Sequence, residues 1–408
     1  MIRLKQLLII LLLLHTIPSW AESDSQYLLT EKTYKALSAA QELMGADKNA
    51  QAEKQLNNLL NEVAAGSYEQ AVVQQTLGYL YSSKGDYKKA SQMFKKALDS
   101  KALPDKVSLD LQYNLGQLLL ADDQYKKGVQ VLEQWLKNES SPPNSARVLL
   151  ASAYYRLKQY NKAIEHIRIA VKKDKSPKEA WYQLWLSAHL ELKQYKSAIK
   201  VLEILVSKYP YNKTYWSQLS SLYLQQNKDF TAVAVKMLAQ RLELGDGKTL
   251  INLADMYRYL RVPYKSGQLL EKGLADGVID SNYENLTKLA DSWLAAKEND
   301  KAVVVLEKLR GLDKSGQSDL KLGRVLFGME KWQESEQALL SAQKKLSGSK
   351  VGTVALLLGM TQFHQEHLQQ AKKYFLVATK YKNERNQAGQ WLRHIDRLLE
   401  AQSNAKPE

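Results

Sequence analysis

The stretch that decides the fold is residues 77–98, LGYLYSSKGDYKKASQMFKKAL. Small residues stand at Gly78, Ala90 and Ala97, and aromatic residues stand between them at regular intervals. Apolar positions recur three and four apart, which is the periodicity of an amphipathic helix and not of a strand. A Gly-Asp pair at 85–86 interrupts this pattern with turn-forming residues. The stretch therefore predicts two helices joined by a tight turn, in which small side chains allow close approach and aromatic side chains fill the wider gaps.

The same arrangement returns roughly every 35 residues, which is the period of a helix-turn-helix array. Later copies include NLGQLLLADDQYKKGVQVLEQWL from Asn114, LLASAYYRLKQYNKAIEHIRIAV from Leu149 and LLGMTQFHQEHLQQAKKYFLVAT from Leu357. The small or turn-facing anchor of the pattern recurs at Gly78, Gly116, Ala151, Trp185, Ser220, Ala254, Ala290, Gly323 and Gly359. For a chain of 408 residues the usual expectation is two or three domains, but a repeat of this kind predicts a stack in which each unit contacts only its neighbours.

We accordingly predict an all-α fold, a right-handed α-solenoid of about nine to ten helix pairs. The first pair matches the pattern poorly, and we interpret it as a cap on the array. The predicted segments are a signal peptide at 1–21, an atypical N-terminal repeat at 22–70, the two halves of the array at 71–245 and 246–384, a capping helix at 385–402 and a disordered tail at 403–408.

The N-terminus has the pattern of a secretory signal peptide. Arg3 and Lys5 form a basic region, and the aliphatic run QLLIILLLL follows them. Ser19 and Ala21 then stand at positions −3 and −1 of a cleavage point before Glu22. The aliphatic run is shorter than the roughly 20 residues that span a bilayer. We expect export with cleavage after Ala21, with retention as an uncleaved anchor as the alternative; a chain without cysteine carries no lipid anchor of the lipoprotein type.

The chain is basic, with 58 Lys and Arg residues against 43 Asp and Glu residues and a net charge of +15. Behind a signal peptide, this excess favours an anionic envelope surface or an acidic partner over nucleic acid. The alternative, which the residues leave open, is that lysine-rich helix faces only keep the protein soluble.

No constellation of catalytic residues is present in the sequence. The chain contains neither cysteine nor a Gly-x-Ser-x-Gly nucleophile motif. The tripeptide at 247–249, GKT, resembles the end of a phosphate-binding loop, but Leu242 stands where that loop needs glycine, so we interpret the tripeptide as the start of a helix. His364 and His367 are three residues apart and could share a metal, although a surface turn fits this segment better. We predict no enzymatic activity, no cofactor and no metal site.

Several copies of the pattern resemble the tetratricopeptide repeat. In the opening stretch the matching residues are Leu77, Gly78, Tyr81, Ala90, Phe94 and Ala97. Trp181-x-x-Leu184 and Trp216-x-x-Leu219 match in later copies, and the resemblance covers nearly all of the chain after the signal peptide.

This resemblance implies an inner groove that is lined by the first helix of each pair and binds a peptide or protein. The corresponding positions are Tyr79, Tyr113, Gln117, Tyr155, Tyr182, His189, Asp255, Arg258, Tyr259, Asp291, Arg324, Phe327, Met360 and Phe363. Aromatic, amide and arginine side chains suit the capture of an extended or helical peptide, whereas packing against the next repeat is the alternative role for each of them. The Lys-and-Asn clamp that some members use for a terminal carboxylate is absent, because Gln75, Tyr79, Tyr113 and Gln117 occupy its positions.

The second half of the chain resembles a narrower group. NLADMYRYLRVPYKSGQLLEKGL from Asn252 and VLFGMEKWQESEQALLSAQKKL from Val325 are similar to the periplasmic tetratricopeptide proteins that gamma-proteobacteria encode beside TonB, ExbB and ExbD. The resemblance implies a periplasmic scaffold with an accessory role in TonB-dependent uptake across the outer membrane, and TonB, ExbB or ExbD as partners. The alternative is an envelope-assembly scaffold that contacts peptidoglycan or the outer-membrane biogenesis machinery.

Overall fold

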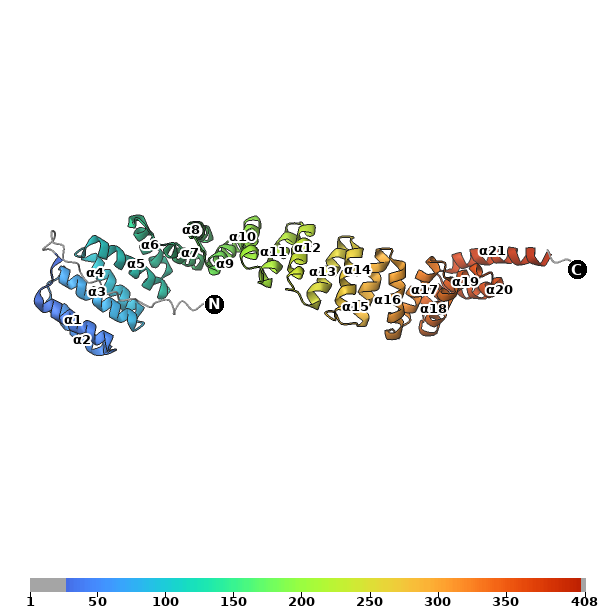
Figure 1. The fold of residues 1–408 in the computed structure, drawn as a ribbon, viewed down its shortest axis with the longest axis horizontal. Coiled ribbons are helices and arrows are strands. Elements are labelled where there is room, and N and C mark those ends of the chain that lie inside the picture. Colours follow the sequence, from blue (N-terminus) through green and yellow to red (C-terminus); the bar gives the residue numbers. More distant parts are fainter. Residues whose placement is uncertain (1–26, 405–408) are drawn as a thin grey trace. The chain divides into compact units, whose positions relative to one another are not determined.

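The computed structural model describes residues 27–404, and the predicted signal peptide at 1–21 lies outside this range. The described residues form twenty-one α-helices and no strand (Figure 1). By chain order, twenty of these helices make ten helix-turn-helix units and α21 remains single, so the predicted all-helical array of nine to ten pairs is confirmed. No described helix combines the length and the hydropathy that crossing a membrane requires.

The chain divides into two compact units, and the division between Leu205 and Val206 lies inside the helix α10. The segment boundaries predicted from the sequence stay a prediction. The helices that belong to the first unit are α1 (Glu31–Gly45), α2 (Asn49–Glu62), α3 (Tyr68–Ser83), α4 (Tyr87–Asp99), α5 (Asp105–Ala121), α6 (Tyr125–Asn138), α7 (Asn144–Arg156), α8 (Tyr160–Lys173) and α9 (Glu179–Glu191), followed by most of α10 (Tyr195–Lys208).

The second unit contains the remaining helices. They are α11 (Lys213–Gln225), α12 (Asp229–Arg241), α13 (Gly247–Tyr259), α14 (Pro263–Ala275), α15 (Tyr283–Ala295), α16 (Asn299–Leu312), α17 (Gln317–Gly328), α18 (Trp332–Lys345), α19 (Lys350–His364), α20 (Leu368–Ala378) and α21 (Arg385–Asn404). In both units, helices that are neighbours in sequence pack on each other, as α3, α4 and α5 do in unit 1 and α13, α14 and α15 do in unit 2. This nearest-neighbour packing is the property that defines a solenoid.

Close packing within a pair depends on the glycine anchors. A Cβ added at Gly78 would collide with the ring of Phe94, and a Cβ added at Gly359 would lie 2.6 Å from the ring of Phe375. Both rings are almost completely buried. Gly116 meets Leu132 and Gly323 meets Leu339 in the same way. The predicted alternation of small and large residues is therefore the means by which the two helices of a pair approach each other.

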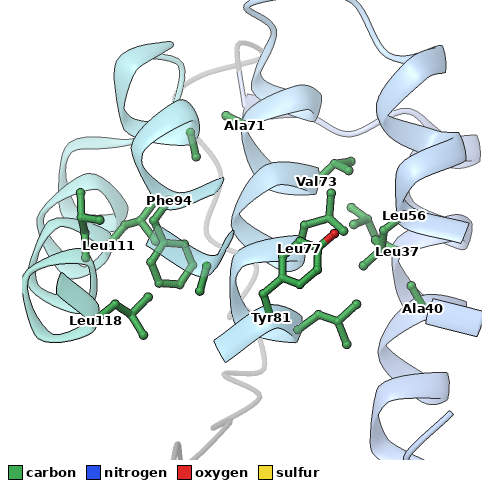
Figure 2. Packing of buried hydrophobic residues seen from close by; sticks show 14 of the residues in the cluster. Leu37, Ala40, Leu56, Ala71, Val73, Leu77, Tyr81, Phe94, Leu111 and Leu118 are labelled. Carbon is green, nitrogen blue, oxygen red and sulfur yellow. The ribbon is translucent and has the colours of Figure 1, made fainter. Parts of the chain in front are cut away.

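The hydrophobic core of the first repeats is continuous from α1 to α5. Figure 2 shows Leu77 and Tyr81 on the side of α3 that faces Leu37 and Leu56, and Phe94 on the other side of α3. Buried side chains of α3 thus face the preceding pair, and Phe94 of α4, the second helix of the same pair, packs on the other side of α3. Such a helix cannot bury its apolar surface alone, because each repeat completes the core of its neighbours.

The turn inside each pair contains one residue in the left-handed conformation. Only the second pair uses glycine, Gly85, at φ 76°; the others use residues such as Lys158 and Lys193, at φ 58° and 55°. The turn is stabilised by hydrogen bonds back to the preceding helix, for example from the Gln159 amide to the Tyr154 carbonyl at 2.9 Å. Residues other than glycine are strained in this conformation, and most of these turns contain no glycine at that position. The residue types in the turns therefore do not predict which residue adopts the left-handed conformation.

The predicted helix starts and ends are also informative. Asp246 caps α13 by accepting a hydrogen bond from the Thr249 amide at 2.8 Å, so the GKT tripeptide opens a helix as predicted. Pro263 occupies the first turn of α14, where its missing amide hydrogen is not needed. At the C-terminus, α21 continues to Asn404 and so runs two residues into the segment predicted as a disordered tail.

Candidate protein-binding surface

All the predicted groove residues lie on first helices of pairs, namely α3, α5, α7, α9, α13, α15, α17 and α19. Successive first helices contact each other directly at α7 and α9 and at α17 and α19. These contacts bring side chains of neighbouring repeats together within each unit. We call these predicted residues, with the first helices that carry them, the first-helix surface. The assignment of these residues to a partner-binding groove stays a prediction.

In unit 1, the tyrosines of this surface link one repeat to the next. The Asn114 side chain on α5 donates a hydrogen bond of 3.2 Å to the Tyr79 hydroxyl on α3. The Tyr155 hydroxyl on α7 donates a longer bond of 3.4 Å to Glu191 on α9. Each hydroxyl therefore lies at the junction of two first helices, where it holds neighbouring repeats together.

The rings of the same residues pack within their own pair. Tyr79 lies edge-on to Phe94 with ring centres 5.0 Å apart, and Tyr113 lies 4.5 Å from Trp135. Tyr155 and Tyr160 form a further edge-on pair. These aromatic side chains have a structural role, which is the alternative that the sequence left open for each of them.

In unit 2, the first helices are linked by ion pairs. Lys288 on α15 lies 2.7 Å from the Asp255 carboxylate on α13. Lys321 on α17 lies 2.6 Å from the Asp291 carboxylate on α15. The two predicted aspartates are therefore neutralised within the protein, and a partner that approached them would meet paired charges.

Two predicted residues are too buried to make a large contact with a partner. The exposed fraction of Tyr182 is 4% and that of His189 is 7%. His189 pairs its Nδ1 with the Gln194 side chain at 2.7 Å, and burial lowers its pKa below the ordinary value for histidine. In contrast, Tyr259 is 79% exposed and Arg324 is also exposed, so these two are the predicted residues most available to a partner.

The C-terminal end of the first-helix surface is an aromatic cluster that the sequence revealed only in part. Phe327 of α17 lies edge-on to Trp332 and to His364, and Phe363 of α19 lies 4.9 Å from Trp391 of α21. The rings of Trp332 and His364 are stacked, with centres 4.3 Å apart and an angle of 5°. Phe327 and Phe363 were predicted. Trp332 was missed although it opens the second helix of its pair, at the position of the aromatic residue in earlier repeats.

The two histidines considered for a metal lie at a surface turn. His364 ends α19 and His367 precedes α20, and both are exposed. The Nδ1 atom of His367 lies 3.0 Å from the side-chain oxygen of Gln362. Among residues 27–404 there is no group of three or more His, Cys, Asp or Glu residues that could hold a metal ion.

A buried polar cluster lies between the third and fourth pairs. Glu133 on α6 accepts a hydrogen bond of 2.9 Å from the Tyr154 hydroxyl, and its same oxygen lies 2.9 Å from His166 Nε2. Burial, aided by the bond to Glu133, raises the pKa of Tyr154 above its ordinary value. Burial lowers the pKa of His166, and the opposing attraction to Glu133 is weaker. The cluster is therefore built around a neutral imidazole and has a structural role.

A second buried cluster lies in unit 2 around Asp319, which is completely buried. Arg310 Nε on α16 lies 2.7 Å from Oδ1 of Asp319, and Lys345 Nζ on α18 lies 2.7 Å from Oδ2. Beside it, burial opposes the ionisation of Asp313, but hydrogen bonds from Ser315 and Ser318 lower its pKa to about 2. These interactions fix the start of α17 between its neighbours.

Comparison with known proteins supports a repeat protein. The family model described as anaphase-promoting complex, cyclosome, subunit 3 matches residues 83–170 and 138–205, which is less than half of the chain. No curated protein matches the sequence. The packed helix pairs repeat along the whole described range. The fold is a tetratricopeptide-like α-solenoid.

Solved structures similar to this repeat protein share little of its sequence. MamA 41-end from Desulfovibrio magneticus RS-1 is 18% identical, covers 42% of this chain and 94% of its own, and has a TM-score of 0.34. The APC/C hetero-tetramer Cut9-Hcn1 is 11% identical over 89% of this chain and 83% of its own, with a TM-score of 0.30. YrrB, described as a TPR protein with an unusual peptide-binding site, is 13% identical over 46% of this chain and 95% of its own, with a TM-score of 0.36.

Proposed function

We propose that the protein is a non-enzymatic periplasmic scaffold that binds a protein partner through the first-helix surface. The observation that carries this proposal is the contact between successive first helices, because it joins side chains of several repeats into one surface that an extended or helical segment can follow. Tetratricopeptide repeats are protein-interaction modules, and this general role is the part of the proposal that the repeat type supports directly.

We further propose that the partner belongs to the TonB energy-transduction system. Support for this part comes from the resemblance of the second half of the chain to periplasmic repeat proteins encoded beside TonB, ExbB and ExbD, and from the signal-peptide pattern at 1–21. The protein would then be an accessory component of uptake across the outer membrane, positioning one protein of the system and performing no chemistry itself.

The binding test uses the exported protein and the purified periplasmic domains of TonB and ExbD. We expect one of them to bind, and Tyr259→Ala together with Arg324→Ala to weaken binding at least about tenfold, since exposed aromatic and arginine residues dominate binding energies. Tyr211→Ala is the matched control, because Tyr211 is 77% exposed and lies outside the first-helix surface. If neither domain binds, the TonB assignment is contradicted. If the control variant weakens binding as much as the double variant, the surface assignment is contradicted.

The localisation test is independent of the partner. Cell fractionation followed by mass spectrometry of the mature protein should place it in the periplasm with Glu22 as its first residue. A chain that keeps residues 1–21 and stays with the inner membrane contradicts cleavage and supports the anchored alternative.

The basic charge supports one alternative function. A net charge of +15 favours binding to an anionic envelope polymer, as an envelope-assembly scaffold would require. Binding of the purified protein to isolated peptidoglycan that disappears in high salt, combined with no binding to TonB or ExbD, would support this alternative over the first proposal.

A further inference from the structure

A groove of about 950 Å³ lies on unit 1 and is lined by none of the predicted residues of the first-helix surface. It is lined by α4 and α6, which are the second helices of successive pairs, and by α5, which packs against both of them. Leu115 and Leu119 of α5 contribute an apolar floor and are themselves nearly buried. Tyr113 and Gln117, the predicted residues of the first-helix surface on α5, do not line this groove. The two surfaces therefore use different faces of the same helix.

The walls of the groove are rich in carboxamide side chains. Gln92 comes from α4, Gln112 from α5, and Gln130 and Gln134 from α6. Each carboxamide carries both a hydrogen-bond donor and an acceptor, and so it can pair with the N–H and C=O groups of a peptide backbone. No aromatic ring is among the described residues that line the groove, whereas unpaired bases are usually held by stacking on such rings. The lining chemistry favours a polypeptide.

The charges along the groove are unevenly distributed: two lysines lie at one end and two aspartates at the other, with Lys95 one turn before Asp99. Lys88 and Lys127 lie in the first turns of α4 and α6, and Lys95 follows two turns later on α4. Asp99 at the end of α4 and Asp105 at the start of α5 lie at the opposite end. Because α4 and α6 both begin at the lysine end and only α5 ends there, the helix dipoles leave a net positive potential at that end. One end of the groove therefore attracts anions and the other attracts cations.

We propose that this groove binds an extended segment of a partner polypeptide that is acidic at one end, basic at the other and apolar between them. The apolar part would contact Leu115 and Leu119, the backbone would pair with the glutamines, and the charged ends would lie against the lysines and the aspartates. The 13 residues of α4 span about 20 Å, which corresponds to about six residues of extended chain. The site is a second docking surface, and its existence does not depend on the identity of the partner on the first-helix surface.

The test is a binding measurement with a capped synthetic hexapeptide that has two acidic residues at one end, apolar residues in the middle and a lysine at the other end. A neutral dye reports binding to the purified protein by fluorescence anisotropy. A peptide of identical composition with interleaved charges is the ligand control. We expect the first peptide to bind at least about fivefold more tightly than the second, and its binding to weaken with salt, because the ends of the groove are exposed.

Matched protein variants locate the site. Lys88→Glu with Lys127→Glu should weaken binding of the first peptide at least about tenfold, since two attractions become repulsions. Lys96→Glu with Lys126→Glu is the control, because these lysines are also exposed, lie on the same helices, and change the net charge equally without lining the groove. Equal weakening by both double variants, equal binding of both peptides, or no binding of either peptide overturns the proposal. Displacement of the bound peptide by a single-stranded oligonucleotide with higher affinity also overturns it, because the groove would then be an anion site for nucleic acid.

Discussion

The two units join their repeats with different chemistry. In unit 1, neighbouring repeats are bridged mainly by tyrosine hydroxyls, as between Tyr79 and Asn114 and between Tyr154 and Glu133. In unit 2, the bridges are mainly ion pairs, as between Lys288 and Asp255. Both units nevertheless stack their helices in the same order and with the same glycine-anchored pairs.

This difference shows that the stacking of repeats depends on apolar packing, and that the polar bridges are interchangeable additions. A tyrosine contributes ring area as well as a hydroxyl, so its contact survives the loss of the hydrogen bond. An ion pair contributes mainly charge, and its strength depends on burial and on salt. The two units should therefore respond differently to the removal of a bridge, to pH and to ionic strength.

The largest expected effect concerns the most buried bridge of each unit. Asp319→Ala should lower the free energy of local opening of α16–α18 by about 3 kcal/mol, because Arg310 and Lys345 lose a buried partner. Glu133→Ala should lower that of α6–α8 by only about 1 kcal/mol, since it removes hydrogen bonds whose partners keep their packing. Native-state hydrogen exchange measures both values.

The control for this comparison is Asp300→Ala, which removes an exposed carboxylate 3.6 Å from Lys331 and should change stability by less than about 0.5 kcal/mol. If Asp319→Ala and Glu133→Ala destabilised their helices equally, the distinction between the two units would be wrong.

The second expected effect is a loss of stability of unit 1 in acid. Burial lowers the pKa of His166 and of His189 in the folded protein, so between pH 7 and 5 the unfolded chain, with its ordinary histidine pKa near about 6.5, binds more protons. The stabilising contribution is complete above that pKa and is lost as the pH falls below it. Denaturant unfolding at several pH values, followed by circular dichroism, measures this slope.

The matched variant is His166→Phe, which keeps an aromatic ring beside Tyr154 but cannot accept a proton. It should flatten the dependence of stability on pH between 7 and 5. A slope as steep as that of the unchanged protein would show that His166 is protonated equally well in both states.

The smallest expected effect distinguishes the exposed bridges by salt. Tyr79→Phe and Asp255→Asn should each cost about 0.5 kcal/mol at low ionic strength. Raising sodium chloride to 0.5 M should reduce the cost of Asp255→Asn, because salt screens the attraction of Lys288, and should leave the cost of Tyr79→Phe unchanged. Equal salt dependence of the two costs in hydrogen-exchange measurements would contradict the assignment of charge to one unit and hydroxyls to the other.

Some features of the site could be predicted from sequence and others could not. The period placed every predicted residue on a first helix, since helical periodicity and repeat register are local properties. It did not show that Tyr182 and His189 are buried while Tyr259 is exposed, because burial depends on the side chains that the next repeat supplies. The aromatic residue that opens a second helix illustrates the same point: Tyr87 is half-buried, whereas Phe230 is 70% exposed.

The amino-acid order by itself determined the helices, their pairing and the places of closest approach, because helix periodicity and the absence of a Cβ at Gly78 or Gly359 act over one or two turns. Only the tertiary structure decided the left-handed turn residues, such as Lys158, and the carboxylate partners of Lys288 and Arg310. These outcomes depend on packing between helices, which over-determines a strained turn and selects among many equivalent charges. The grooves and surfaces available to partners belong to this second group, because they are formed by residues of several repeats at once.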